Sequence, residues 1–384
     1  MDYLVLTKVH GAILGPISQI LGWILNVLVT FTNSFGVLNI GLSIILFTLV
    51  VKLLMFPMTI KQQKASKLMA VMQPELQAIQ AKYKGKTDND SMMKMNVETK
   101  AVYEKYGTSM TGGCLQLVIQ MPILFALYRV IYCIPAYVMP VKEHFLNVVY
   151  ALTGTSSASA LSEGAAANLL QFATDHNIAL TGINPIGDLT GVTGEALANK
   201  MVDILYKLNP AQWSDLAQAF PNAADVISNN ASTIEKMNTF LGINLASNPF
   251  NGSFVPNLAW LIPILAGLTQ YASTKLMMAT QPKKNNEEDM SSQMMQSMNV
   301  TMPLMSVFFC FTFPAAIGIY WVASSTFQLL QQLVVNSYLN KVDMDELIRR
   351  NVEKANKKRA KQGLPPQKVN QNATASLKHM QAVA

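Results

Sequence analysis

The stretch VLNIGLSIILFTLVVKLLMFP, residues 37–57, contains a single charged side chain, that of Lys52. A helix needs about 20 consecutive, mostly apolar residues to cross the hydrocarbon core of a membrane. This stretch therefore predicts a membrane-spanning helix. The same criterion predicts four further spans, at residues 111–139, 256–277, 294–313 and 317–340. A spanning helix satisfies its own backbone hydrogen bonds in lipid, so we expect an all-α polytopic membrane protein with a five-helix core.

The composition also argues against a soluble enzyme. Of the 384 residues, 51% are hydrophobic and 13% are charged, whereas a soluble domain usually carries about 25% charged residues. The sequence has no complete phosphate-binding loop, and its four His are scattered rather than spaced for a metal. We therefore expect no enzyme activity, no metal and no cofactor.

The distribution of Lys and Arg predicts the orientation in the membrane, because cytoplasmic loops carry an excess of both. Residues 61–105 hold nine Lys and five acidic residues, and the tail from residue 341 holds ten Lys and Arg and four acidic residues. Residues 140–254 hold four Lys and nine acidic residues. We expect the two basic segments in the cytoplasm, and the acidic segment and the N-terminus outside.

The first 36 residues allow two interpretations. Small or polar residues recur there every three or four positions, within a sequence that is otherwise apolar: Gly11, Gly15, Ser18, Gly22, Asn26, Thr30 and Asn33. Such a narrow polar stripe is typical of a helix that lies in the membrane interface. An extra spanning helix is the alternative. A cleaved signal peptide is disfavoured, because no net positive charge precedes the apolar region.

Residues 58–110 are expected to form a cytoplasmic helical hairpin. Two rows of residues follow the alternating spacing of three and four that coiled coils use. The first row is Met69, Met72, Leu76, Ile79 and Tyr83, and the second is Met92, Met95, Thr99, Val102 and Tyr106. Gly85 lies in a polar turn between them, and Pro74 is expected to end a helix or to begin a new one. The hairpin is either a solvated loop or a docking arm for a ribosome, a Sec translocon or a nascent chain.

Lys52 is the charged residue inside the first expected span, and no Asp or Glu occurs in any expected span. A charge at the bilayer centre costs about 2.5–3.5 kcal/mol on insertion scales, so it usually faces a partner or a wet cavity. Either Lys52 extends to the inner head groups, or it lines a hydrated groove. Uncharged polar residues on other spans could line the same groove: Gln116, Gln120, Gln270, Tyr320, Ser324 and Gln328. Each of them could instead make an interhelical hydrogen bond.

Four stretches resemble the YidC/Oxa/Albino family of membrane protein insertases, in its Gram-positive-like branch. They are IILFTLVVKLLMFP at 44–57, MQPELQAIQAKY at 72–83, TGGCLQLVIQMPILFAL at 111–127 and FPAAIGIYWVASSTFQLLQQ at 313–332. The resemblance implies a bacterial plasma-membrane insertase with a hydrophilic groove that is open to the cytoplasm and lipid. It implies that Lys52 holds the position of the basic groove residue, where the family usually has Arg. It also implies that Gln120, Met121 and Pro122 contact substrate, and that the hairpin receives nascent membrane proteins first.

Two segments depart from this resemblance or extend beyond it. The extracytoplasmic segment 140–255 is much longer than is usual in this branch, with an apparent insertion at 141–238. Helical patterns within it fall at 196–208, 211–220 and 223–240. The tail 341–384 carries a basic cluster and then Gly, Pro and Asn, a composition that predicts disorder. Its charge could bind the ribosome or anionic lipids, or could serve only as a cytoplasmic anchor.

Two classes of function follow from these observations. The first is an insertase and membrane chaperone that works alone or beside the Sec translocon. The second is a small-solute transporter or channel. Transporters often contain internal repeats, and this sequence shows none.

Overall fold

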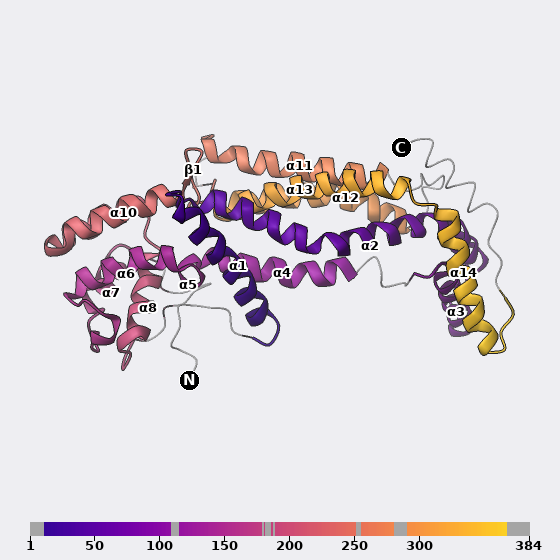
Figure 1. Cartoon of the computed structure of the whole chain (residues 1–384), viewed down its shortest axis with the longest axis horizontal. Helices are drawn as coiled ribbons and strands as arrows, with labels where there is room; N and C mark the ends of the chain where they lie inside the picture. Colours follow the sequence, from indigo (N-terminus) through magenta and orange to yellow (C-terminus); the bar gives the residue numbers. More distant parts are fainter. Residues whose placement is uncertain are drawn as a thin grey trace. The chain divides into compact units, whose positions relative to one another are not determined.

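The structure is a computed structural model that describes residues 11–108, 115–178, 180, 186, 189–250, 255–279 and 290–366 (Figure 1). The described residues are predominantly helical, which confirms the all-α prediction. The described strands are the short β1 (Thr239–Phe240) and β2 (Ile243–Asn244), which pair in antiparallel fashion. The five-helix membrane core stays a prediction.

Two of the described helices are long and apolar enough to cross a membrane, judged by length and composition alone. They are α1 (Leu14–Ser34) and residues Ile40–Met69 of α2 (Ile40–Lys82). Two helical segments, Met121–Tyr132 and Thr301–Thr312, are apolar but shorter. Buried helices of soluble proteins can pass the same test, so these helices support a membrane protein without fixing the number of spans.

The chain divides into two compact units. The first comprises Met1–Val50, Gln120–Ala266 and Ser306–Ala323, and the second comprises Val51–Ile119, Gly267–Met305 and Ser324–Ala384. Four long helices, α2, α4 (Leu115–Tyr132), α11 (Leu261–Ala279) and α13 (Ala315–Asn340), contribute residues to both units. A fifth, α12 (Met290–Thr312), does the same.

In the first unit, the polar stripe of α1 faces protein over much of its length. Gly15, Ser18 and Gly22 are buried, and α1 packs against α5 (Ile134–Tyr137) and α6 (Met139–Thr153). A Cβ atom at position 22 would overlap the ring of Tyr137, so this close approach requires glycine. The large exposed side chains of α1 are apolar: Ile20, Trp23, Val27 and Phe31. Both interpretations of residues 1–36 stay predictions.

The second expected span, residues 111–139, contains a helix break. α4 ends at Tyr132, Cys133 is non-helical, and the short α5 follows with Pro135 in its first turn. Proline has no backbone N–H and its ring clashes with the preceding turn, which favours a break before it and suits the first turn of α5. The apolar composition of this stretch concealed the break.

The described part of residues 140–255 folds into a small group of helices. After α6 come η1 (Ala158–Ala160), α7 (Ala167–Asp175), α8 (Gly194–Leu205), α9 (Pro210–Ala219), η2 (Pro221–Ala223) and α10 (Ala224–Asn238). The helical patterns at 196–208, 211–220 and 223–240 are confirmed by α8, α9 and α10. The helix α9 begins with a capping box, in which Asn209 and Gln212 each bond to the other's backbone N–H.

A tight turn follows α10 and holds the start of α13. Leu241 and Gly242 both have positive φ angles, which the turn between β1 and β2 requires. The carbonyl of Leu245 then accepts a hydrogen bond from Ala316 N, and that of Ser247 accepts one from Ala315 N. These bonds satisfy backbone donors that the first turn of a helix leaves free. The short η3 (Leu258–Trp260) leads from this region into α11.

In the second unit, three helices form a bundle: the end of α2, α3 (Asn89–Tyr106) and α14 (Met344–Lys361). The prediction that Pro74 breaks or begins a helix is wrong, because Pro74 lies inside α2. Pro74 is exposed, while its neighbours Met72 and Leu76 are buried. Packing on both sides of the proline therefore holds the helix together despite the missing backbone hydrogen bond.

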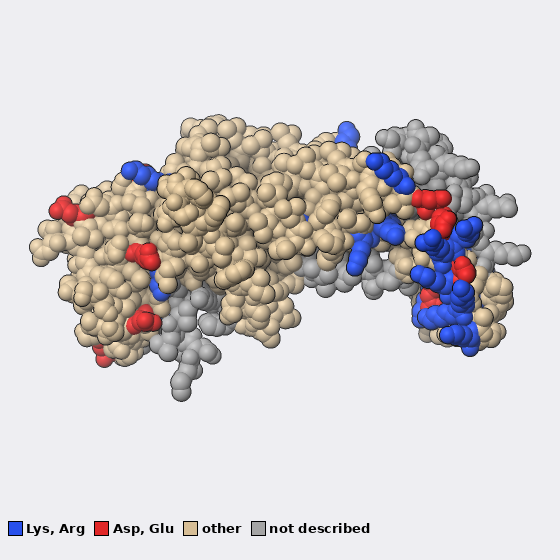
Figure 2. Space-filling view, in the orientation of Figure 1, with Lys and Arg blue, Asp and Glu red and all other residues tan. Residues whose placement is uncertain are grey.

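The prediction of a disordered tail is wrong for residues 344–361, which form α14. Asp343 caps the helix by accepting a hydrogen bond from Glu346 N at 3.0 Å. Ile348 and Val352 are buried against α2 and α3. An apolar face therefore orders a segment whose charged composition suggested disorder. Figure 2 shows the Lys and Arg side chains gathered over α14.

Candidate functional site

Lys52 lies on α2 in the second unit, where its side chain is half-buried. Its neighbours Leu53 and Leu54 are 59% and 68% exposed. The part of the chain that the structure describes offers Lys52 no ion pair. The backbone carbonyl of Lys52 accepts a hydrogen bond from Gln331 Nε2 on α13, at 2.8 Å. This bond places α13 beside α2 at the position of the predicted groove cation.

Gln331 extends the polar stripe that the sequence predicted on α13. Ser324, Gln328 and Gln331 are four and three residues apart, so they share one face of the helix. All three are half-buried. Because Gln331 contacts α2 at Lys52, this face of α13 is directed toward α2. The sequence reasoning missed Gln331, although its spacing from Gln328 was the signal that could have found it.

Tyr320 is the predicted stripe residue that belongs to the first unit. It is 5% exposed, so it is part of a packed interior. Its i, i+4 spacing from Ser324 is retained, because α13 is continuous. Tyr320 therefore stays a candidate on helical spacing alone.

On α11, the polar residues make interhelical hydrogen bonds. Thr269 Oγ1 and Ser325 Oγ are 2.6 Å apart, and Ser273 Oγ donates to the carbonyl of Ser325 at 2.9 Å. Such bonds between small polar residues join membrane helices. Gln270, the predicted groove residue of this helix, is half-buried. The structure thus joins α11 to α13 through Thr269 and Ser273, while Gln270 stays a groove candidate.

The predicted residues of the second span lie on α4. The side chains of Gln116 and Gln120 fall outside the described part of the structure. Met121 is 41% exposed and Pro122 is half-buried inside the helix. Gln120, Met121 and Pro122 belong to the first unit, whereas Lys52 belongs to the second. Their shared groove therefore stays a prediction.

The hairpin residues pack most tightly toward the base of the hairpin. Met72 is fully buried and Leu76 is 8% exposed, while Met69 and Ile79 pack at the edge of the same cluster. On α3, Val102 and Tyr106 are buried, but Met92 near the tip is 47% exposed. The residues of the two predicted rows are therefore buried toward the base and more exposed toward the tip.

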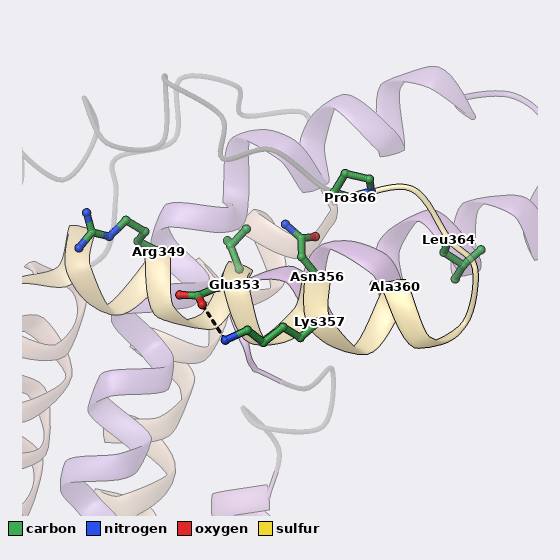
Figure 3. A pocket seen from close by; sticks show the side chains of 8 residues that line it. Arg349, Glu353, Asn356, Lys357, Ala360, Leu364 and Pro366 are labelled. Carbon is green, nitrogen blue, oxygen red and sulfur yellow. Dashed lines mark ion pairs between the residues drawn. The ribbon is translucent and has the colours of Figure 1, made fainter.

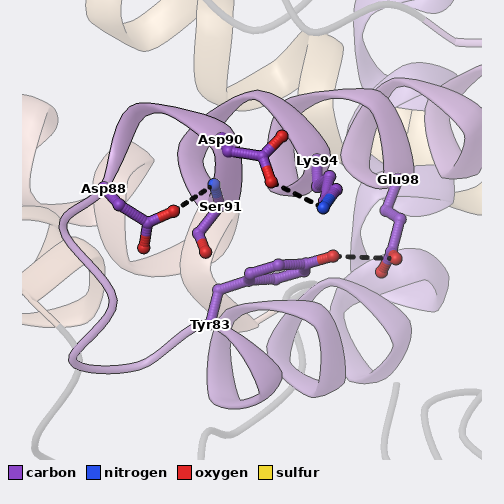
Figure 4. A network of polar contacts seen from close by, with 6 residues as sticks. All are labelled: Tyr83, Asp88, Asp90, Ser91, Lys94 and Glu98. Carbon is purple, nitrogen blue, oxygen red and sulfur yellow. Dashed lines mark hydrogen bonds and ion pairs between the residues drawn. The ribbon is translucent and has the colours of Figure 1, made fainter.

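Polar contacts hold the tip of the hairpin (Figure 4). Asp88 caps α3 by accepting a hydrogen bond from Ser91 N at 2.8 Å, and this bond holds the pKa of Asp88 below its usual value. Asp90 pairs with Lys94 at 2.6 Å. Tyr83, the last residue of the first row, donates to Glu98 Oε1 at 3.0 Å. Figure 4 shows these side chains spanning the turn from α2 to α3.

A buried ion pair joins the two helices at the base. Lys105 Nζ lies 2.8 Å from both carboxylate oxygens of Glu75, and Tyr106 Oη donates to Glu75 Oε1 at 2.6 Å. The side chains of Lys105 and Glu75 are 8% and 15% exposed. Burial, and then the nearby Glu75, raise the pKa of Tyr106 well above its usual value. The sequence reasoning missed this group, because the register of the two helices was not known.

Two hollows lie elsewhere on the described surface. One, of about 730 Å³, runs along one side of α14 and is lined by Arg349, Glu353, Asn356 and Lys357 among others (Figure 3). The other, of about 660 Å³, lies in the first unit between α8, α10 and the end of α4. The described residues contain no cluster of three or more His, Cys, Asp or Glu suited to a metal.

Comparison with known proteins decides the family. The model of the 60Kd inner membrane protein family matches residues 30–159 and 216–342, which together make up more than half of the sequence. The chain belongs to this family. The match confirms the resemblance seen in the sequence. It leaves out residues 160–215, which lie inside the apparent insertion.

Several curated relatives match most of the chain. The membrane protein insertase YidC of Oceanobacillus iheyensis is 27% identical and covers 79% of this chain and 78% of its own length. The membrane protein insertase MisCA of Bacillus subtilis is 25% identical over 81% and 76%. The membrane protein insertase YidC 2 of Listeria innocua is 24% identical over 91% and 82%. The chain is thus similar to bacterial insertases along most of its length.

Proposed function

We propose that this protein is a membrane protein insertase of a bacterial plasma membrane. It moves hydrophobic segments of nascent membrane proteins from the cytoplasm into the lipid bilayer. The similarity to three named insertases over most of the chain carries this proposal. The described apolar helices and the membrane-type composition agree with it.

The groove is proposed to run along the polar face of α13 beside Lys52. The bond from Gln331 to the Lys52 carbonyl supports this placement, since Gln331 shares one helical face with Ser324 and Gln328. Exposed apolar residues adjoin the same helices, including Leu53, Leu54 and Leu330. A polar channel beside a lipid-like surface would let a polar tail follow the groove while an apolar segment enters the membrane. Lys52 would attract acidic residues of the translocated tail.

The cytoplasmic parts are proposed to meet the substrate first. The hairpin and α14 would contact the ribosome, since the outward side of α14 carries several Lys and Arg (Figure 2). The same charge would attract anionic lipids. A Sec translocon is a further proposed partner for some substrates. This arrangement places the hairpin and the C-terminus in the cytoplasm and the N-terminus outside.

A solute transporter or channel was the other candidate, and none of the three relatives described above carries such a name. Reconstitution into liposomes distinguishes the two classes. The purified protein should integrate a small, single-span coat-protein-like substrate, as measured by protection of its translocated tail from protease. Protein-free liposomes, and liposomes with a Lys52→Glu variant, are the controls. Flux of small solutes without substrate integration would contradict the proposal.

A further inference from the structure

One apolar face of the hairpin is covered by the C-terminal helix. This face consists of Leu68, Val71, Met72, Leu76, Val102 and Tyr106, each at most 8% exposed. We call these six residues the hairpin face. On α14, Ile348 is 1% exposed and Val352 is 7% exposed against them, and Leu347 packs at the edge. Without α14, the hairpin face would be open to water or to another apolar helix.

The contact with α14 rests on few side chains. Ile348 and Val352 are the only buried ones among the α14 side chains that the structure describes. Asn351 Nδ2 donates a hydrogen bond to the carbonyl of Tyr106 at 2.9 Å. The rest of α14 is largely charged and exposed, with Arg350, Lys354 and Lys358 on its outer side. Elements with few buried apolar contacts open at low free energy, and the Glu75–Lys105 pair would keep α2 and α3 together if α14 left.

We propose that the hairpin face is an exchangeable docking surface, which α14 covers in the resting protein and a nascent apolar helix takes over during insertion. This inference rests on the proposed insertase function and adds a competition between substrate and the protein's own C-terminal helix. A released α14 stays soluble because of its charge.

The way α14 binds indicates what kind of partner fits. It inserts two apolar residues four positions apart into the space between α2 and α3, which is the helix-in-groove mode of recognition. A transmembrane segment is apolar on every side, so it can present more apolar contacts to this surface than α14 does. A ligand displaces a resident element only by binding the open state better. Met69 and Met72 suit such exchange, because flexible methionine side chains adapt to different apolar partners.

A disulfide that locks α14 onto α3 tests the exchange. A Cβ built at Gly107 would lie 3.2 Å from Asn351 Cβ, close to the Cβ separation of about 3.5–4.5 Å found in disulfides. The variant Gly107→Cys with Asn351→Cys is made in a background in which Cys114, Cys133 and Cys310 are replaced by Ser. A photo-crosslinking residue replaces Met69, at the edge of the hairpin face. The reduced form of the same protein is the matched control, since it shares the strain of Cys at the positive φ of Gly107.

The reduced protein should crosslink a ribosome-stalled nascent span and insert the substrate, and the oxidised protein should lose at least fivefold in both. Restoration of both by reductant would support the exchange. Equal crosslinking and insertion in the oxidised and reduced forms would overturn it and make α14 a permanent third helix of the bundle. If the cysteine-free protein with native Gly107 and Asn351 fails to insert the substrate, it is the insertase proposal itself that fails.

A second variant keeps the test decisive if the cysteine pair disturbs folding. Ile348→Asp with Val352→Asp should detach α14 while leaving the hairpin residues unchanged, and trypsin should then cleave within α14 more rapidly. On the exchange model, this variant crosslinks the stalled span at least as well as the wild-type protein. Loss of crosslinking would mean that α14 must stay docked, which contradicts the proposal. The control Ala360→Asp adds an acidic side chain at an exposed position of α14 and leaves its buried residues and its lysines unchanged.

Discussion

The amide of Gln331 donates a hydrogen bond to the backbone carbonyl of Lys52, and the two atoms are 2.8 Å apart. Five residues after Lys52, Pro57 interrupts the backbone hydrogen bonds of α2, since it has no N–H to offer. A side chain from α13 thus supports α2 next to its internal proline. The same contact brings one residue of the polar face of α13 to the backbone of Lys52.

Replacing Gln331 by Leu should weaken this support. A neutral hydrogen bond contributes about 1 kcal/mol net, which corresponds to about a fivefold change in an equilibrium. We expect insertion to fall by about that factor, as measured by protease protection of the substrate. Ser337→Leu, which alters an exposed position on the same helix, should have little effect. Equal losses in both variants would show that added apolar bulk, and not the lost bond, is responsible.

Lys52 is expected to act through its charge. Lys52→Arg should retain insertion and Lys52→Glu should lose it, with the largest loss for substrates whose translocated tails are acidic. The measurement is insertion of a matched substrate pair that differs only in tail charge. If Lys52→Leu retains full activity toward both substrates, the electrostatic role is wrong. Lys52 then only extends to the inner head groups.

The buried pair of Glu75 and Lys105 should stabilise the hairpin as a unit. Removing one partner of a buried ion pair costs about 3–5 kcal/mol, because the other charge remains uncompensated. Lys105→Met should therefore lower the temperature at which the hairpin becomes sensitive to protease. The double variant Glu75→Leu with Lys105→Met should be less damaging than the sum of the two single changes. Additive effects would indicate that the two side chains do not interact.

The outer side of α14 should bind polyanions through charge. Lys354, Lys358 and Lys361 form no ion pairs among the described residues, and all are exposed. Changing the three to Glu should weaken co-sedimentation with ribosomes, most visibly at low salt, since contacts with phosphates release counterions. Lys236→Glu on α10, which lies in the other compact unit, is the control. Unchanged co-sedimentation at every salt concentration would leave α14 with only an anchoring role.

Much of the helical fold was predictable from local signals. The apolar run around Lys52 predicted a helix, and Gly85 marked the turn of the hairpin. The end of α4 at Tyr132 was missed because Pro135 acts within a sequence that stays apolar on both sides. Pro74 was misjudged for the opposite reason, since a local rule predicted a break that tertiary packing around Met72 overrides.

The hairpin register and α14 depended on contacts between distant residues. Glu75 with Lys105 and Lys82 with Glu98 fit one antiparallel register centred near residue 90, but opposite charges alone allow several registers. For α14, Asp343 three residues before Glu346 was a readable start signal. The charged composition nevertheless suggested disorder. The apolar surface that orders Ile348 and Val352 belongs to other helices, so the tail sequence alone does not reveal it.

The continuous helix α2 connects the hairpin mechanically to Lys52. From Lys52 to Met72 the helix continues for twenty residues with Pro57 inside it, a length of about 30 Å at 1.5 Å per residue. A tilt of about 10° at the hairpin end would shift the opposite end of this section by about 5 Å, by the same helical geometry. A displacement of the hairpin would therefore also move Lys52, because both lie on this one helix and no loop separates them.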